Sequence, residues 1–214
     1  PIIRSTVWKY LDCGIMEHGF ARARCPGCGY DFFVAFSCKT RFFCPSCAQT
    51  RTLIWGAWVS GILAEVDHRQ WVFTIPKVLR KLFYKDRLLL AGLARCAAAT
   101  ILELYREVFR GKDFRPGIIT STQTFGDLLI WHPHIHCLFT DGAFDAVGHF
   151  HPFAVSTNDQ ATQIFREKVF AMMKEQERIS DGPGEKMRQW RHSGFSVHRG
   201  DVVPKEDREA LGRL

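Results

Sequence analysis

Apolar and polar positions alternate along residues 132–140, and this is the clearest pattern in the chain. In an extended strand, successive side chains point to opposite faces of the sheet. His132, His134 and His136 would therefore share one face, while Ile135 and Cys137 would lie on the other. Imidazoles at this spacing can bind one divalent metal ion without help from a loop. An isolated His-x-His would favour the alternative, a histidine-rich strand whose rings only form hydrogen bonds. The strand predicted just upstream, which could place Gln123 beside the histidines, shifts the balance toward a metal site.

Hydrophobic periodicity predicts the remaining elements. Helices are expected over residues 1–12, 49–66, 86–110 and 159–178, and strands over residues 70–76, 117–126, 148–152 and 194–198. Residues 181–184 are expected to form a turn, and a last helix is expected to start near Lys205. Pro133 suits the start of a strand or an edge strand, and Asp141 is expected to serve the turn beside Gly142. From residue 70 onward this order is typical of a split βαβ, ferredoxin-like α+β sandwich with an antiparallel sheet.

Two Cys-x-x-Cys pairs separated by fifteen residues lie near the N-terminus. This spacing is typical of a tetrahedral four-thiolate zinc site, and a redox pair or buried free thiols explains two such pairs less well. The predicted zinc ligands are Cys25, Cys28, Cys44 and Cys47. Cys13, His18 and Cys38 could form part of a second site, replace one ligand, or simply pack against the module.

The chain has 214 residues and a formal net charge of +7, which favours a polyanionic partner such as nucleic acid. Basic residues alternate with phenylalanines around the cysteines, and a second basic cluster with a tryptophan precedes the last strand. These residues could bind phosphates and stack on bases, although solvated basic faces would look the same. The predicted DNA-binding residues are Arg22, Arg24, Lys39, Arg41, Arg191 and Arg199.

The chain divides into a zinc-binding domain with a bridging helix, residues 1–66, and a second domain, residues 67–214. No apolar run is long enough to span a membrane and no signal-peptide pattern is present, so a cytoplasmic protein without membrane contact is expected. In that reducing compartment, eight cysteines favour metal binding or burial over a disulfide framework.

Residues 123–126, 132–136 and 140–144 together resemble the core of the HUH-endonuclease transposases. More narrowly, the chain resembles the rolling-circle insertion-sequence type that carries an N-terminal cysteine-rich zinc domain. His134 and His136 would supply the His-hydrophobic-His motif. The resemblance implies a zinc-ribbon-like module followed by an HUH nuclease domain. It also implies a DNA transposase that binds single-stranded DNA at transposon ends.

In this family the paired histidines hold Mg²⁺ or Mn²⁺ against the scissile phosphate, together with one more polar ligand. We expect Gln123 to be that ligand, with His132 and His198 as competitors. The resemblance further implies cleavage by a tyrosine on a later helix, through a 5′-phosphotyrosine intermediate.

The nucleophile is where the chain departs from the family. No tyrosine follows Tyr105, so the catalytic tyrosine is expected after Leu214. The 214 residues are therefore expected to be a fragment that binds metal and DNA without cleavage. Two other functions remain: a non-catalytic zinc-ribbon DNA-binding or recruitment protein, and a replication initiator or relaxase. The cysteine module argues against the second.

Overall fold

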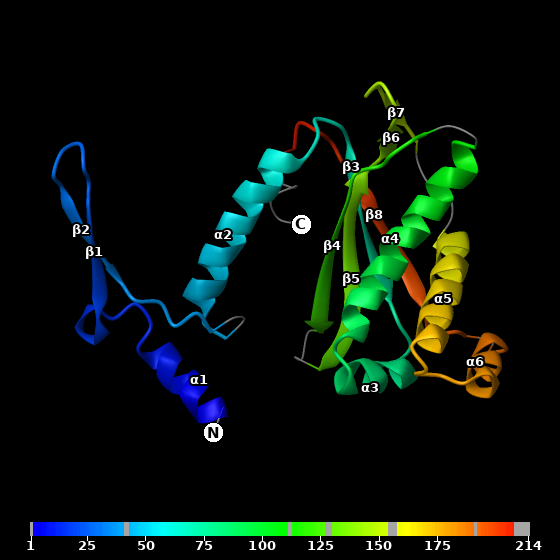
Figure 1. The fold of residues 1–214 in the computed structure, drawn as a ribbon, viewed down its shortest axis with the longest axis horizontal. Coiled ribbons are helices and arrows are strands. Elements are labelled where there is room, and N and C mark those ends of the chain that lie inside the picture. Colours follow the sequence, from blue (N-terminus) through cyan, green and yellow to red (C-terminus); the bar gives the residue numbers. More distant parts are fainter. Residues whose placement is uncertain are drawn as a thin grey trace. The chain divides into compact units, whose positions relative to one another are not determined.

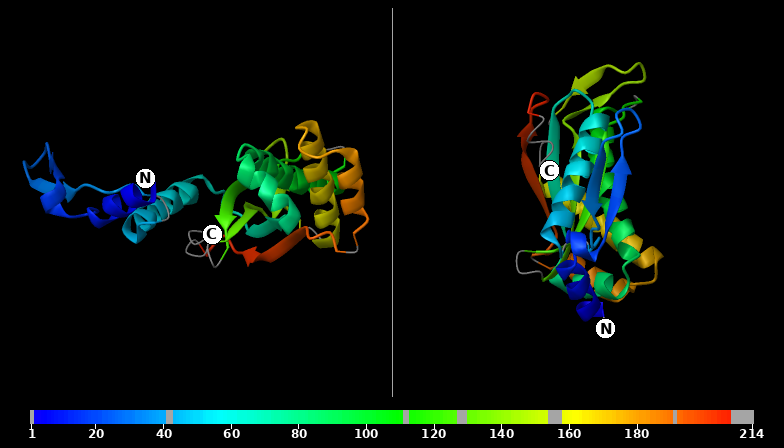
Figure 2. Two further views of the ribbon diagram at one scale, coloured as in Figure 1. Left: turned by 90° about the horizontal axis from the view of Figure 1, so that it is seen from below. Right: turned by 90° about the vertical axis from the view of Figure 1, so that its left-hand side faces the viewer.

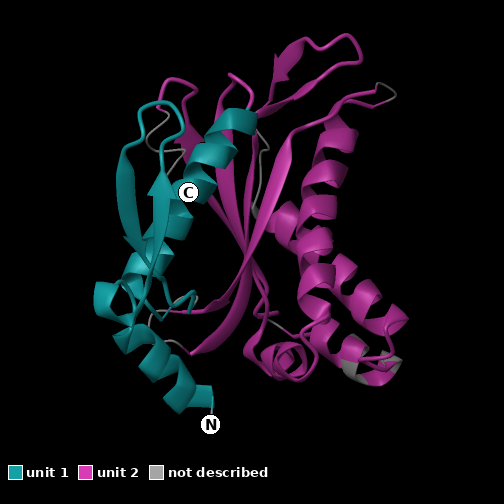
Figure 3. Ribbon diagram, turned by 60° about the vertical axis from the view of Figure 1, so that its left-hand side comes forward, with its two compact units in different colours: residues 1–63, 213 teal, residues 64–212, 214 magenta. Residues whose placement is uncertain are grey.

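The computed structural model describes residues 2–40, 43–110, 113–126, 130–153, 158–190 and 192–207. These residues form two compact units, and the chain passes from unit 1 to unit 2 between Leu63 and Ala64 (Figure 3). The predicted boundary lies three residues later, between Val66 and Asp67. None of the described helices is long and apolar enough to cross a membrane.

Unit 1 contains a helix, a short 3-10 turn, a hairpin and a second helix. In chain order these are α1 (Ile2–Leu11), η1 (Met16–His18), β1 (Phe20–Arg24), β2 (Asp31–Ala35) and α2 (Pro45–Ile62). The antiparallel register pairs Phe20 with Ala35 at one end of the hairpin and Arg24 with Asp31 at the other. Among the described side chains of this unit, Cys44 and Val59 are the only buried hydrophobic ones. So small a core is typical of a module that depends on a metal ion for its stability.

Unit 2 is an antiparallel sheet covered by helices (Figure 1). Its elements are β3 (His68–Thr74), α3 (Lys77–Lys85), α4 (Leu89–Val108), β4 (Ile118–Phe125), β5 (Trp131–Thr140), β6 (Gly142–Phe144), β7 (Phe150–Pro152), α5 (Asn158–Glu175), α6 (Asp181–Arg188) and β8 (Ser196–Val203). The four long strands pair in the order β4-β5-β3-β8, while β6 and β7 form a separate hairpin. This is the α+β fold with a split βαβ strand order that the sequence predicts.

The core of unit 2 lies between the sheet and the pair of helices α4 and α5, which run side by side (Figure 2). Trp71 and Phe73 of β3 are fully buried there, as are Ile135 and Cys137 of β5. These residues occupy alternate positions, so the side chains between them point to the opposite face of the sheet. Burial of these apolar side chains is favourable, and it determines which face of each strand packs against the helices.

Three local predictions differ from the structure. Helix α3 begins directly after Pro76, where the sequence predicts no helix. Only two residues separate it from strand β3, and this short separation is why the helix is missed. The turn expected at residues 181–184 is instead the first turn of α6, a position where proline is tolerated because the N–H groups there lack helical acceptors. A turn occupies residues 205–206, where the last helix is expected to start, and residues 208–214 lie outside the described residues. Pro133, by contrast, lies near the start of β5, as the sequence predicts, and the register between β4 and β5 shifts beside it.

A buried ion pair joins the strands at one end of the sheet. The Arg69 side chain donates from Nε and Nη2 to the two carboxylate oxygens of Asp141, at 2.9 and 2.8 Å. Nη1 of Arg69 also donates to the carbonyl of Gly200 on β8, at 3.2 Å. Both charged side chains are largely shielded from water, with exposed fractions of 6% and 11%. Asp141 thus has a role that the sequence does not predict, because its carboxylate ties the end of β5 to Arg69 of β3.

Loss of this carboxylate is expected to destabilise unit 2 strongly. Asp141→Ala leaves the Arg69 guanidinium buried without its counter-charge, so we expect the free energy of unfolding to fall by about 3–5 kcal/mol. Chemical denaturation followed by tryptophan fluorescence measures the loss. Asp113→Ala is the matched control, because Asp113 pairs with Arg115 at the surface, and this variant should be unchanged. Equal stability of the two variants would contradict the structural role of the buried pair.

Candidate metal centres

Four cysteine sulfurs converge in unit 1. The Sγ atoms of Cys13, Cys38, Cys44 and Cys47 all lie within 4.8 Å of one another. The Cys13–Cys47, Cys38–Cys47 and Cys13–Cys44 sulfur pairs are separated by 3.6, 3.5 and 3.6 Å. Four thiolates around Zn²⁺, each with a Zn–S bond of about 2.3 Å, place their sulfurs roughly 3.8 Å apart. The arrangement therefore fits a tetrahedral zinc ion.

Local structure explains how these sulfurs meet. Cys44 occupies the N-cap of α2 and Cys47 lies in its first turn, so the start of one helix brings these two sulfurs together. The backbone N–H of Cys38 donates to the Cys13 sulfur at 3.4 Å. Burial opposes ionisation of Cys38, but hydrogen bonds from the hydroxyl and backbone N–H of Thr40 outweigh it and lower the pKa of this thiol to about 6. A thiolate is the form that binds zinc.

The predicted ligands Cys25 and Cys28 do not belong to this cluster. They lie in the turn between β1 and β2, at the end of the hairpin away from η1. A five-residue strand spans about 17 Å, so the two ends of the hairpin cannot share one ion. Cys13 and Cys38 take their places, which was one of the alternatives that the sequence left open. His18 instead contacts Asp12, with its Nδ1 2.9 Å from the carboxylate.

The histidines of β5 line the face of the sheet opposite the hydrophobic core. Across the strands, His134 lies between Gln123 of β4 and Thr74 of β3. The imidazole centroids of His134 and His136 are 5.0 Å apart, and those of His132 and His134 are 5.1 Å apart. The structure thus brings together three imidazoles and the amide of Gln123. His198 is separated from His136 by Val72 of β3, about 10 Å of sheet, and is not adjacent.

A hydrogen bond at one ring nitrogen decides whether the other keeps its lone pair. Nδ1 of His134 lies 2.8 Å from the backbone carbonyl of His132, so Nδ1–H donates and Nε2 keeps its lone pair. Nδ1 of His136 lies 3.2 Å from the amide nitrogen Nε2 of Gln70, which donates to it. With the amide turned to present Oε1 instead, Nδ1–H of His136 would donate and its Nε2 would keep a lone pair. The buried Nε2 atoms of His132 and His136 have no hydrogen-bond partner among the described residues. Buried polar atoms without a partner are costly, and a bound metal ion would satisfy them.

Burial favours the neutral form of two of these rings, His132 and His136. Burial is the main cause that lowers the pKa of His136, and the neighbouring His134 adds to it. Burial also lowers the pKa of His132, with further contributions from the charges of Arg80 and Lys77. A neutral imidazole is the form that ligates metals. Gln123 donates from Nε2 to the carbonyl of Phe125 at 3.2 Å, which leaves its Oε1 free to serve as a ligand. Imidazole nitrogens suit borderline transition metals, and the amide oxygen of Gln123 is the ligand of this set that suits Mg²⁺ or Mn²⁺.

The contribution of Gln70 is not visible in the sequence. Its position in a predicted strand places it on one of two faces, but only the register between β3 and β5 brings it to His136. A hydrogen-bond partner on the ring nitrogen that does not bind the metal fixes the ring orientation and tautomer of metal-binding histidines.

The predicted DNA-binding residues are dispersed. Arg22 forms an ion pair with Asp31 across the hairpin, while Arg24 and Lys39 are exposed. Arg199 lies on β8 and is half-buried. The other two predictions, Arg41 and Arg191, fall outside the described residues.

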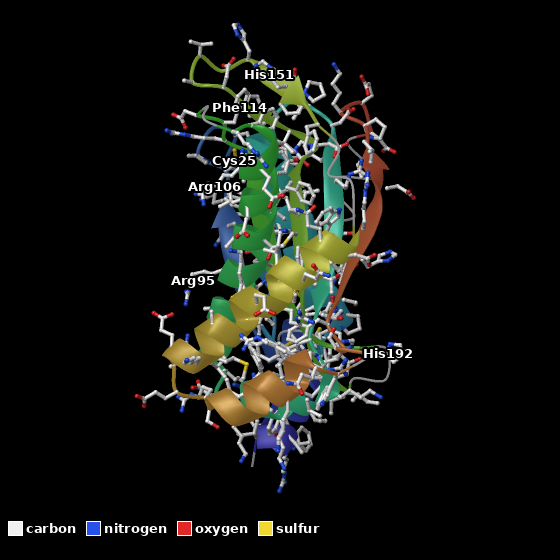
Figure 4. All side chains as sticks on the ribbon, turned by 90° about the vertical axis from the view of Figure 1, so that its right-hand side faces the viewer. Cys25, Arg95, Arg106, Phe114, His151 and His192 are labelled. Carbon is white, nitrogen blue, oxygen red and sulfur yellow. The ribbon has the colours of Figure 1, made fainter. Side chains whose placement is uncertain are left out.

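A second His-x-His pair, His149 and His151, lies on the β6–β7 hairpin. His151 contacts Asp145 at 2.9 Å and packs against Phe114, and the two rings are labelled in Figure 4. Its hydrogen bond to Asp145 is the main cause that lowers the pKa of that carboxyl to about 2. These histidines thus serve the hairpin at the surface and provide a control for the β5 pair.

The cysteine geometry predicts which thiols hold zinc. Cys13→Ser removes one of four clustered sulfurs, so we expect zinc per chain, measured by mass spectrometry of acid-digested protein, to fall well below one. Because folding and zinc binding are coupled in such modules, unit 1 should also lose its protection from proteolysis. Cys25→Ser is the matched control and should keep its zinc. Zinc loss in Cys25→Ser with zinc retained in Cys13→Ser would instead support the hairpin-turn ligands.

Comparison with known proteins gives a consistent result. The family described as a transposase zinc-binding domain matches residues 1–75, and a family described as a putative transposase matches residues 117–209. The chain is 34% identical over 145 residues to the transposase for insertion sequence element IS801 of Pseudomonas savastanoi pv. phaseolicola. This match covers 67% of the chain and 34% of that protein.

A putative transposase, y4qJ, of Sinorhizobium fredii is 30% identical over 124 residues, which cover 58% of the chain and 31% of that protein. The chain thus spans about a third of the length of these curated relatives. No solved structure matches it. Since the two matched domains together span most of the sequence, in the same order as the two units of the fold, the chain belongs to the transposase family that carries this zinc-binding domain.

Proposed function

We propose that the histidine face of unit 2 is the metal-dependent DNA-processing site of a transposase of the HUH type. His134 and His136 would hold Mg²⁺ or Mn²⁺ through their Nε2 atoms, and Gln123 would add its amide oxygen. The substrate would be single-stranded DNA at a transposon end. One observation carries the proposal: two adjacent imidazoles on one sheet face, with their Nδ1 atoms occupied by hydrogen bonds and the buried Nε2 of His136 left without a partner.

The chain's own residues would bind and orient the phosphate. A divalent ion at this site supplies Lewis-acid polarisation of the phosphate and offsets the charge that develops in the transition state. A tyrosine oxygen would attack phosphorus and lose its proton. The new oxygen–phosphorus bond replaces the bond to the 3′ oxygen, whose electron pair leaves with it and takes up a proton. The products are a 5′-phosphotyrosine and a free 3′-hydroxyl, and the conserved bond energy allows rejoining without ATP.

In the family the attacking tyrosine lies on a helix after the sheet, whereas all four tyrosines of the sequence precede the histidine strand. Tyr105 is fully buried on the core side of the sheet, and its hydroxyl donates to the carbonyl of Thr140 at 2.7 Å. Burial raises the pKa of Tyr105 well above its ordinary value. The proposal therefore assigns metal and DNA binding to these residues and leaves the attacking hydroxyl to a tyrosine outside them. The zinc-binding unit would add a separate contact to DNA.

Metal binding tests the proposal directly. We expect the intact chain, with zinc already bound, to take up one Mn²⁺, detected by loss of the free-Mn²⁺ signal in electron paramagnetic resonance. The double variant His134→Ala/His136→Ala should lose this binding. The double variant His149→Ala/His151→Ala removes a second pair with the same spacing and should bind as the intact chain does. Mn²⁺ binding that survives loss of the β5 pair would favour a non-catalytic DNA-binding protein.

Gln70 provides a finer test of the same site. Metal binding through Nε2 of His136 requires the proton on Nδ1, so the Gln70 amide would have to turn its oxygen toward that N–H. Gln70→Glu supplies an acceptor there and should preserve or raise Mn²⁺ affinity. Gln70→Leu removes the acceptor and should lower the affinity by about 10–100-fold. Titration with Mn²⁺ gives the affinities, and ¹⁵N chemical shifts of the imidazole report the tautomer of His136. Weakened binding in both variants would show that Gln70 acts by donating, and the tautomer assigned here would be wrong.

A further inference from the structure

Helix α3 and the residue pair that follows it carry a dense positive charge. The cations are Lys77, Arg80, Lys81, Lys85 and Arg87, against a single acid, Asp86. That acid is already occupied, since its carboxylate contacts Arg178 at 2.6 Å. Within the described residues, none of the five cations forms an ion pair. Uncompensated cations on one short helix raise its free energy through mutual repulsion, and a polyanion would relieve this repulsion.

Aromatic rings lie among these charges. Trp131, the first residue of β5, donates its indole N–H to the carbonyl of Arg80 at 2.7 Å, which fixes the ring against α3. Tyr84 packs edge-on against Trp131, with ring centroids 5.4 Å apart. The Arg87 guanidinium lies over the same indole, 5.2 Å from its centroid. The Tyr84 side chain is 61% exposed, so its ring is open to an incoming planar group.

This surface adjoins the end of the strand that carries the histidines. Trp131 immediately precedes His132 in β5, and its hydrogen bond to the Arg80 carbonyl holds α3 beside this end of the strand. From Trp131 to His136 the strand covers about 17 Å. The imidazoles of His132, His134 and His136 follow one another along this length. A nucleic-acid strand that rests on α3 would therefore be led toward the proposed metal site.

We propose that this α3 surface, formed by Lys77, Arg80, Lys81, Tyr84, Lys85, Arg87 and Trp131, binds the single-stranded DNA that flanks the phosphate at the histidine face. The proposal rests on the proposed function and adds the position at which the strand is held. Cations track the phosphates, and exposed aromatic rings stack on bases that duplex DNA keeps paired. The combination of unpaired cations and an exposed tyrosine thus favours a single strand over a duplex.

The test is DNA binding by the intact chain, with zinc bound and without added Mg²⁺ or Mn²⁺. Fluorescence anisotropy is measured with a short unstructured single-stranded oligonucleotide and with the matching duplex. Lys81→Glu/Arg87→Glu should weaken single-strand binding at least tenfold. It should also reduce the slope of log affinity against log salt by roughly 1.4, for two lost phosphate contacts. The control Arg95→Glu/Arg106→Glu carries the same charge change on the outer face of α4, where Figure 4 shows both side chains, and should have little effect.

Stacking is tested at Tyr84. Tyr84→Ala should weaken single-strand binding roughly tenfold, and Tyr84→Phe should bind as the unmodified chain does, because the ring and not the hydroxyl stacks on the base. An equal loss in the α4 control, an unchanged Tyr84→Ala, or an equal loss on duplex DNA would overturn the proposal in favour of a general basic surface. This binding is measured without Mg²⁺ or Mn²⁺, whereas the metal site is tested by Mn²⁺ uptake, so failure of the metal site and failure of the α3 surface appear in different measurements.

Discussion

Pairing between β3 and β5 at the centre of the sheet determines where every functional side chain of unit 2 lies. Trp71 pairs with Cys137 and Phe73 with Ile135, and all four are buried against the helices. The intervening pairs bring Val72 to His136 and Thr74 to His134 on the opposite face. Because side chains alternate with a period of two, a slip of one residue would bury the imidazoles and expose the aromatic layer. The hydrophobic core therefore also fixes the geometry of the histidine site.

The two units are stabilised by different interactions. Unit 2 has a large apolar layer, and the polar links around it, such as the Arg69–Asp141 pair, tie its strands together. Unit 1 buries almost nothing besides Cys44 and Val59, so burial of apolar surface alone does not account for its shape. Sulfur–zinc bonds can supply the missing stabilisation, because ligation closes the loops that bring Cys13 and Cys38 to the start of α2. Zinc would thus have a structural role in unit 1, whereas the divalent ion proposed for unit 2 would have a chemical role.

The sequence predicts what depends on local periodicity and misses what depends on tertiary pairing. The β5 histidines are predictable, since alternation alone places them on one face. The zinc ligands are not, because Cys25 and Cys28 have the expected local spacing but the hairpin carries them away from Cys44 and Cys47. Helix α3 is not predicted, because it follows strand β3 so closely along the chain. The contact between Gln70 and His136 can be predicted only when the register between β3 and β5 is known. Local spacing shows that a residue can bind a metal ion, and only the fold shows which residues bind the same ion.

The most direct test of the account is X-ray diffraction from crystals of the zinc-loaded chain soaked in Mn²⁺, with anomalous data collected at the manganese and zinc absorption edges. The account predicts zinc among Cys13, Cys38, Cys44 and Cys47. It also predicts a separate manganese peak within bonding distance of Nε2 of His134 and His136. A histidine face without manganese, in crystals where the face is open to solvent, would contradict the claim that this sheet carries the metal-dependent DNA-processing site.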